Sequence, residues 1–170
     1  MTVFVVLLRA VNVGGTGKLP MSDLRRICEA AGFAAVRTYI ASGNVVFHST
    51  ATEARVKALL EDALNAFAGK PVGVLVRSAA EIAEILARNP FPKARPNRTV
   101  TIFLDKPPPP DTLTTLSGQK HEEVQLGKRE IYVFYGEGMA SSKLKIPAAK
   151  AGTARNMNTV AKLAELAAKI

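Results

Sequence analysis

The sequence predicts an α+β fold made of two related subdomains, and three observations support this prediction. The 170 residues are 48 % hydrophobic and 22 % charged, a composition typical of a globular protein with a buried core. Short apolar runs typical of strands alternate with stretches in which apolar residues recur every three or four positions, as in amphipathic helices. Over residues 1–77 these stretches follow the order strand, helix, strand, strand, helix, strand.

Local signals set the bounds of the elements in the first subdomain, residues 1–77. Pro20 opens a stretch with helical spacing that ends at Gly32, and Thr52 is a typical N-cap for a second helix that ends at Gly69. The Ser42-Gly43 pair predicts a tight hairpin turn, because glycine adopts the positive φ that such turns need. Strands are expected at residues 3–8, 36–41, 44–48 and 71–76. This is the order of a ferredoxin-like βαββαβ sandwich, in which helices cover one face of an antiparallel sheet.

The second subdomain, residues 78–170, is predicted to be a related α/β unit that ends in a C-terminal helix. Ser78 and Glu81 form the pattern of a capping box, and the helix that they begin stops at Asn89-Pro90. Further elements are expected as a strand at 99–104, a polyproline segment at 107–110, a helical turn after Asp111, a hairpin of 123–126 with 131–135, and a helix from about Asn158. The order α-β-α-β-β-α resembles a circular permutation of the element order of the first subdomain.

The formal net charge of +9 is unevenly placed. Residues 1–85 hold nine Lys or Arg against seven Asp or Glu, whereas residues 86–170 hold fourteen against seven, so the halves carry +2 and +7. Two basic stretches carry the excess: Arg88, Lys93, Arg95 and Arg98, and then Lys143, Lys145, Lys150, Arg155 and Lys162. Such a basic protein attracts phosphates or acidic partners, although a solubilising surface with no dedicated partner fits the charge equally well.

Residue types also indicate the cellular compartment of the protein and the kinds of site that it can form. The chain has one cysteine, Cys28, and no basic N-terminal region followed by a long apolar stretch, which together predict a cytoplasmic protein. No run approaches the roughly 20 apolar residues of a membrane span, so no membrane partner is expected. His48 and His121 have no further ligand at metal-binding spacing, so no metal site is expected. The sequence identifies no cofactor and no catalytic residue, and we expect a monomer or a weak oligomer.

The predicted topology brings two loops of the first subdomain together. In a split βαβ unit the first two strands are parallel, so residues 9–20 and 41–44 emerge at the same edge of the sheet. This edge would gather groups that suit an anion, namely Arg9, Asn12, Gly14, Gly15, Lys18, Ser42 and Asn44. Glycines let backbone N–H groups approach a phosphate or carboxylate, and the cations supply charge. Ordinary turn chemistry is the alternative for the glycines, and hydrogen bonding within the turn is the alternative for Ser42 and Asn44.

Three further candidates precede the last helix: Arg155, Asn156 and Asn158. Helix capping would explain the two asparagines. Arg155 at a helix N-terminus would oppose the helix dipole unless an anion lies beside it, and it would join the Arg9 edge if the last helix packs there. The stretch from Asn12 to Lys18 lacks the first glycine of the phosphate-binding loop of nucleotide hydrolases, and Leu19 stands where that loop has Ser or Thr.

Several stretches carry a resemblance to a known family: LRAVNVGG at 8–15, KLPM at 18–21, TYIASGNVVF at 38–47, SKL at 142–144 and TARNMNTV at 153–160. They resemble the bacterial DUF1697 family over almost the whole chain. The resemblance implies an α+β protein with duplicated ferredoxin-like subdomains and an uncharacterised activity. The family commonly has Trp where this chain has Met157, and the segment between Lys145 and Thr153 is shorter than usual.

The sequence therefore favours a protein that binds an anionic or phosphorylated ligand at the edge formed by the first loop and the hairpin turn. Binding of single-stranded RNA or DNA through the basic second half is the main alternative. The two central strands offer Phe4 and Phe47 for stacking on bases, and we expect both in the core instead. An enzyme of unknown reaction is the third alternative, since a fold does not set its function.

Overall fold

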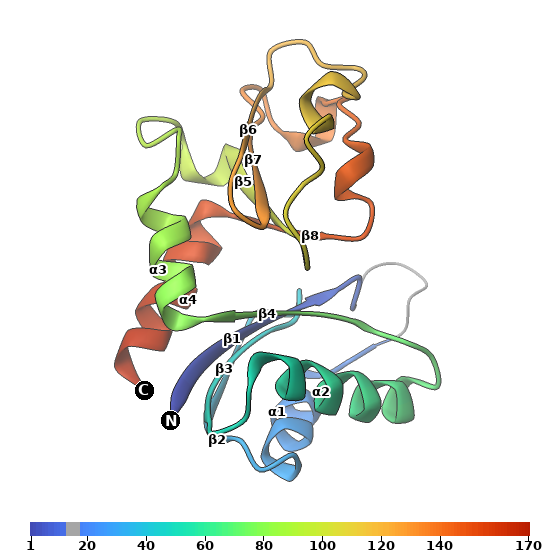
Figure 1. Ribbon diagram of the computed structural model, residues 1–170, viewed down its shortest axis with the longest axis vertical. Helices are drawn as coiled ribbons and strands as arrows, with labels where there is room; N and C mark the ends of the chain where they lie inside the picture. The colour runs from blue at the N-terminus through green and yellow to red at the C-terminus, as the bar shows by residue number, and fades with distance from the viewer. Residues whose placement is uncertain (13–17) are drawn as a thin grey trace. The chain divides into compact units, whose positions relative to one another are not determined.

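The computed structural model of the chain describes residues 1–12 and 18–170. The structure divides into two units, residues 1–83 with 162–170 and residues 84–161. Each unit contains a four-stranded antiparallel sheet (Figure 1). These sheets, with the helices that accompany them, confirm the predicted α+β class.

The first unit has the predicted βαββαβ order. Its elements are β1 (Thr2–Arg9), α1 (Met21–Ala30), β2 (Ala34–Tyr39), β3 (Asn44–Ser49), α2 (Glu53–Ala68) and β4 (Gly73–Ser78). The strands lie in the order β2-β3-β1-β4, and β1 pairs antiparallel with both β3 and β4. Figure 1 shows α1 and α2 on the same face of this sheet. This is the ferredoxin-like topology that the sequence predicts.

Apolar side chains between the sheet and the two helices form the core of the first unit. Phe47 of β3 is fully buried and stacks on Phe33, with ring centroids 4.2 Å apart. Phe4 of β1 lies beside Phe47, with centroids 6.1 Å apart, and is only 4 % exposed. Both central-strand phenylalanines therefore belong to the core, as expected, and neither presents a ring to a nucleic-acid base.

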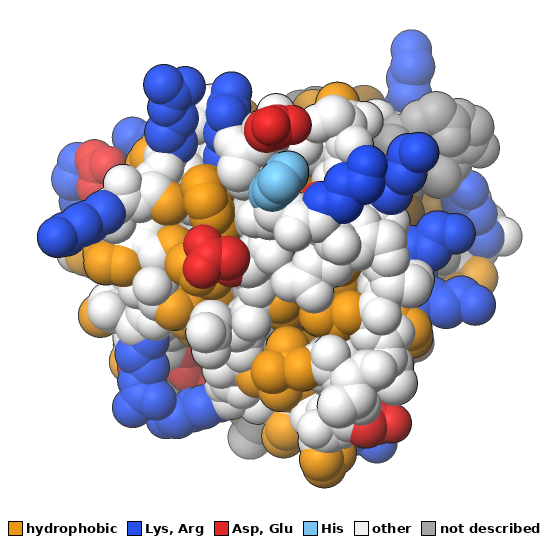
Figure 2. Space-filling model, turned by 90° about the horizontal axis from the view of Figure 1, so that it is seen from above, with side chains coloured by type: hydrophobic (Ala, Val, Ile, Leu, Met, Phe, Trp, Pro, Cys, Tyr) orange, Lys and Arg blue, Asp and Glu red, His pale blue; other side chains and the backbone are white. Residues whose placement is uncertain are grey.

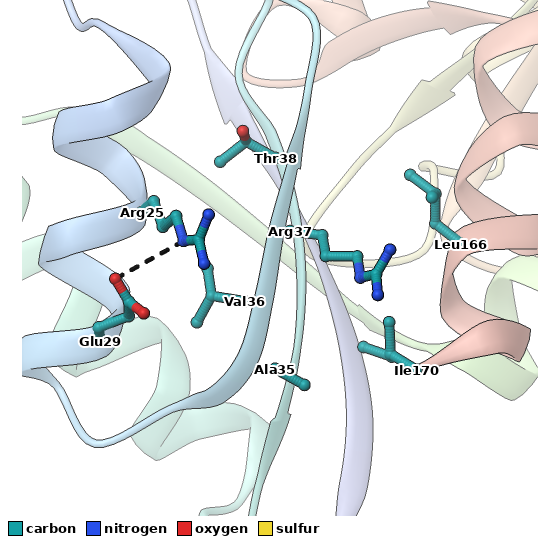
Figure 3. Close-up of a pocket in the computed structure, with 8 residues that line it drawn as sticks. All are labelled: Arg25, Glu29, Ala35, Val36, Arg37, Thr38, Leu166 and Ile170. Atoms are coloured by element: carbon teal, nitrogen blue, oxygen red, sulfur yellow. Dashed lines mark ion pairs between the residues drawn. The ribbon is translucent and has the colours of Figure 1, made fainter.

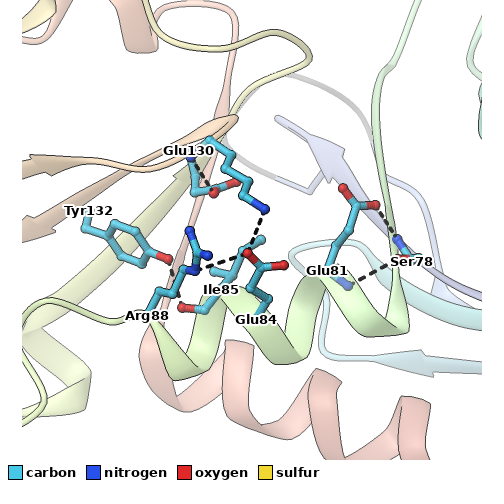
Figure 4. Close-up of polar contacts among 8 residues, drawn as sticks. Ser78, Glu81, Glu84, Ile85, Arg88, Glu130 and Tyr132 are labelled. Atoms are coloured by element: carbon cyan, nitrogen blue, oxygen red, sulfur yellow. Dashed lines mark hydrogen bonds and ion pairs between the residues drawn. The ribbon is translucent and has the colours of Figure 1, made fainter.

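The predicted helix signals are present in the structure. The Thr52 Oγ1 accepts a hydrogen bond from the Arg55 N–H at 3.2 Å, and Gly69 ends α2 in the left-handed conformation with φ 70°. The helix α3 (Ala79–Ala87) begins at the capping box: the Ser78 N–H donates to Glu81 Oε1 at 2.9 Å, and the Glu81 N–H donates to Ser78 Oγ at 3.1 Å (Figure 4).

The second unit also has an antiparallel sheet, in the order β6-β7-β5-β8. Its strands are β5 (Thr99–Phe103), β6 (Glu123–Leu126), β7 (Glu130–Phe134) and β8 (Thr153–Asn156). The 3₁₀ turn η1 (Pro96–Arg98) precedes β5, and three further 3₁₀ turns lie between the strands: η2 (Thr112–Thr114), η3 (Met139–Ser141) and η4 (Pro147–Ala149). The helix α4 (Met157–Lys169) follows β8, just as α3 follows β4.

The strand β8 corrects one detail of the sequence prediction. Its four residues are too few to show the two-residue period of a strand, and their Asn is also typical of a helix N-cap, so the segment was expected as the approach to the last helix. With β8 in place, the second sheet has the same strand order as the first, without a circular shift. The turn η2 stands where the first unit has α1, and the turns η3 and η4 stand where it has α2.

Two kinds of contact connect the end of α3 with the second sheet. The Tyr132 hydroxyl of β7 donates to the Ile85 carbonyl at 2.8 Å, and burial raises the pKa of this tyrosine above its ordinary value. Glu84 pairs with Lys128, in the turn between β6 and β7, at 2.8 Å, and with Arg88 at the end of its own helix at 3.1 Å (Figure 4 shows the latter pair). The end of α3 is therefore held against the second sheet by a buried hydrogen bond and by one ion pair.

Candidate functional site

The loop after β1 and the turn between β2 and β3 meet, as the topology predicts. Asn12 Nδ2 donates to the Ala41 carbonyl at 2.8 Å, and the Leu8 N–H donates to the Gly43 carbonyl at 2.8 Å. Gly43 has φ 90°, and a Cβ added there would lie 2.6 Å from Val11 Cγ2. A residue with a side chain at position 43 would therefore push the two segments apart.

Asn12 closes the β1–α1 loop on itself. Its Nδ2 donates to the Leu19 carbonyl at 2.9 Å, and its Oδ1 accepts from the Leu19 N–H at 2.7 Å. The backbone of Asn12 is left-handed, with φ 56°, a conformation that asparagine tolerates better than most residues. The side-chain amide of Asn12 thus bonds to backbone groups of Leu19 and Ala41. Gly14 and Gly15, the two glycines of the predicted site, lie outside the described residues.

Ser42 and Asn44 serve the turn that they belong to. Asn44 is fully buried, and its Nδ2 donates to the Tyr39 carbonyl at 2.9 Å and to Ser42 Oγ at 3.0 Å. These bonds match the alternative in which both side chains satisfy the hairpin turn. Arg9 and Lys18, two further residues of the predicted site, line a pocket.

This pocket, the Arg9 pocket, has a volume of about 680 Å³ and lies entirely in the first unit. Its described lining residues are Arg9, Ala10, Val11, Lys18, Leu19, Leu64, Phe67, Ala68, Lys70, Pro71, Val72 and Gly73. Three of them are cations and none is acidic. The side chains therefore give the pocket a positive charge and an otherwise apolar wall.

The pairing of β1 with β4 builds one side of the pocket. Arg9 is opposite Gly73 in the register of the two strands. A Cβ added at Gly73 would lie 2.7 Å from Arg9 Cβ and 3.3 Å from Arg9 Cδ. The absence of a side chain at position 73 therefore lets the stem of Arg9 lie across the start of β4.

Sequence analysis missed Lys70, Phe67 and the residues around them. They come from the end of α2 and the start of β4, which the pairing of β4 with β1 brings to Arg9. The predicted topology contains this signal, because the fourth strand of a split βαβ unit runs antiparallel to the first. The segment just before β4 must then lie near the end of β1.

The three candidates near the last helix belong to the second unit, where Arg155 is a residue of β8. Arg155 is 7 % exposed, and its Nη1 donates to Thr153 Oγ1 at 2.6 Å and to the Ala154 carbonyl at 2.9 Å. Burial lowers its pKa to about 10. Asn156 caps α4 by accepting from the Thr159 N–H at 3.0 Å, and Asn158 is exposed.

A second pocket of the first unit, of about 630 Å³, lies along the edge strand β2 (Figure 3). Arg25 points toward Glu29 and pairs with it at 3.7 Å, whereas Arg37 lies on the other side of β2, toward Leu166 and Ile170. The glutamate offsets one of the two arginines. This pocket is therefore less suited to an anion than the Arg9 pocket.

Two further titratable groups, Cys28 and Glu122, have shifted pKa values that arise from burial or from hydrogen bonds to nearby residues. Cys28 is fully buried, and burial, followed by the charge of Glu29, raises the pKa of its thiol to about 12. Glu122 of the second unit accepts from Ser142 Oγ at 2.6 Å and from the Lys120 N–H at 2.6 Å, and these bonds, with Ser142 first, lower its pKa to about 2. Neither group has the exposure or the basicity of a catalytic nucleophile or base.

Within the described residues, no group of three or more His, Cys, Asp or Glu side chains is placed to hold a metal ion. Over the same part of the chain, every helix is too short or too polar to cross a membrane. Figure 2 shows one face of the molecule, where Lys and Arg side chains lie around the margin and acidic groups are sparser. The positive charge of the sequence is thus visible as a surface property.

Comparisons with known proteins place the chain in a family. Residues 1–132 match the model of a family described as a protein of unknown function, DUF1697. The structure is similar to that of the conserved bacterial protein SP0830 from Streptococcus pneumoniae, with 26 % sequence identity, a TM-score of 0.82 and 98 % of each chain covered. No curated protein matches the chain. The chain therefore belongs to the DUF1697 family of proteins of unknown function.

Proposed function

We propose that this protein binds a small anionic ligand, a phosphate ester or a carboxylate, in the Arg9 pocket. The observation that carries the proposal is the meeting of Arg9, Lys18 and Lys70 around one cavity whose described lining has no acidic residue. A guanidinium binds the oxygens of phosphate or carboxylate in pairs, and ammonium groups add charge without a fixed direction.

The surrounding structure supports this use of the pocket. Arg9 is the last residue of a central strand, and its stem lies against Gly73 of the neighbouring strand, which limits where the guanidinium can go. Asn12 ties Leu19, the residue after Lys18, to the β2–β3 turn through its bonds to the Leu19 and Ala41 carbonyls.

Calorimetric titration with methyl phosphate at low salt tests the proposal. The native protein should bind it, and Arg9→Gln and Lys70→Gln should each weaken binding by about tenfold, the effect of roughly 1.4 kcal/mol for one charge-assisted contact. Arg55→Gln is the matched control. Arg55 is an exposed cation of the same helix as Phe67, and twelve helical steps of about 1.5 Å place it roughly 18 Å away along the axis.

Three outcomes would count against the proposal. They are no binding by the native protein, equal losses in Arg55→Gln and the pocket variants, and binding that is confined to single-stranded oligonucleotides. The last result would move the function to the basic second unit, and its affinity would fall steeply with salt. We also propose the cytoplasm as the compartment, on the ground that Cys28 is a free, buried thiol.

A further inference from the structure

We infer that the anion bound in the Arg9 pocket carries a short apolar group, alkyl or aryl, that packs against Phe67 and Val72. This inference rests on the proposed function, because it concerns the same pocket. The ligand would be an amphipathic anion. Its phosphate or carboxylate would lie at the three cations, and its carbon chain would lie along the end of α2.

The composition of the lining carries the inference. Apart from the three cations, every described lining residue lacks a polar group on its side chain: Ala10, Val11, Leu19, Leu64, Phe67, Ala68, Pro71, Val72 and Gly73. A ligand rich in hydroxyl or amide groups would lose hydrogen bonds to water and meet no side-chain partner on these walls. A hydrocarbon group beside the phosphate or carboxylate therefore fits these nine described residues.

Phe67 gives the apolar wall an exposed ring. Leu60 and Leu64 of α2 are buried in the core, whereas Phe67, near the end of the same helix, is 48 % exposed and lines the pocket. A ligand that covers this ring would remove apolar surface from water on both partners, which is favourable. The pocket volume of about 680 Å³ lies within the range of about 300–1,000 Å³ that is usual for small-molecule sites.

A homologous series of ligands tests the inference. Calorimetric dissociation constants are measured for methyl, ethyl, propyl and butyl phosphate with the native protein. Each added methylene should tighten binding by about twofold to fourfold, since full burial of one methylene corresponds to about fourfold. The heat-capacity change of binding should become more negative along the series. A moderate increase in sodium chloride should weaken every member by a similar factor, because screening acts on the charged group that all of them share.

Variants of the protein distinguish the contribution of the ligand's apolar group to affinity from that of its charged group. Phe67→Ala should reduce the ratio of butyl to methyl affinity by about threefold or more, because the longer chain covers more of the ring. Leu113→Ala is the matched control, since Leu113 is 47 % exposed, belongs to the second unit and does not line the pocket. It should leave both affinities unchanged.

The outcomes distinguish failure of the inference from failure of the proposed function. Equal affinities along the series, with methyl phosphate bound, would overturn the apolar group and leave anion binding in place. A lack of binding by every member would overturn both. A third outcome is binding to vesicles of anionic phospholipid that is lost in Phe67→Ala, with no binding of the soluble phosphates. It would show that Phe67 contacts a membrane surface, and it would also overturn the inference.

Discussion

Gly73 lies directly opposite Arg9 in the ladder between β1 and β4, and the stem of Arg9 occupies the space that a side chain at position 73 would need. The closest approach, 2.7 Å to Arg9 Cβ, concerns the base of the side chain and not its flexible end. The path of the Arg9 stem therefore depends on the absence of a side chain at position 73.

Gly73→Ala tests this dependence. The added methyl group should displace the side chain of Arg9 and weaken methyl phosphate binding by about threefold to tenfold, less than the loss of the charge itself. The far-ultraviolet circular dichroism should stay native, because Gly73 is at the exposed start of β4. Combining Gly73→Ala with Arg9→Gln should cost no more than Arg9→Gln alone. Additive losses would show that Gly73 acts independently of Arg9.

Asn12 should contribute to stability through its three hydrogen bonds to Leu19 and Ala41. We expect Asn12→Ala to lower the free energy of unfolding by about 1–3 kcal/mol, because three backbone groups lose their partner and alanine is strained at positive φ. Asn12→Gly is the control that relieves the strain while removing the same bonds. Urea unfolding measures both variants, and native stability in Asn12→Gly would show that these bonds contribute nothing.

Glu122 should make the second unit sensitive to acid. Its hydrogen bonds from Ser142 and Lys120 lower its pKa from 4.5 to about 2 in the folded chain. A carboxyl whose pKa is lower in the folded state stabilises it above the unfolded pKa and loses that contribution as the pH falls through the folded pKa. The stability difference between native and Glu122→Gln protein should therefore be constant near neutral pH and shrink from pH 4.5 toward pH 2.

Urea unfolding at a series of pH values measures this difference. Glu123→Gln is the matched control, because Glu123 is the exposed neighbour of Glu122 at the start of β6. Ser142→Ala should make the acid-sensitive contribution of Glu122 smaller, since Ser142 is the largest cause of the low pKa. A difference between native and Glu122→Gln protein that does not vary with pH would contradict this role.

Cys28 should be inert in the native protein. Its thiol is fully buried and has a pKa of about 12, so the thiolate that reacts with disulfide reagents is scarce and inaccessible at neutral pH. Labelling at pH 8 should be slow and should accelerate as urea opens the fold. Rapid, complete labelling without denaturant would show that α1 does not keep Cys28 in the core.

The sequence was enough to predict the fold of the first unit and the meeting of its two loops. The signals were local: an N-cap at Thr52, a left-handed glycine at 69 and a tight turn at Gly43. The strand β8 was not predicted, because four residues are too few to show the alternation of apolar and polar side chains that marks a strand. Its pairing with β5 also joins segments that are far apart in the sequence.

The site was harder to predict, because residue type does not reveal what a polar side chain contacts. Asn12 and Asn44 have the same chemistry whether they bind a ligand or hold a backbone, and here they bond to the chain's own carbonyls. Lys70 is far from Arg9 in sequence, and strand pairing alone brings it to the pocket. Arg9 and Lys18 were site candidates because of their charge and the predicted topology, and both line the pocket.

The central claim is that an anion binds at the Arg9 pocket, and the most direct test is to map its binding by two-dimensional NMR of the ¹⁵N-labelled protein titrated with butyl phosphate. We predict saturable shifts of the backbone amides of Phe67, Lys70, Val72 and Gly73, with little change at Lys143, Lys145 and Lys150. Shifts confined to the basic segment of the second unit, or none at any concentration, would contradict the claim.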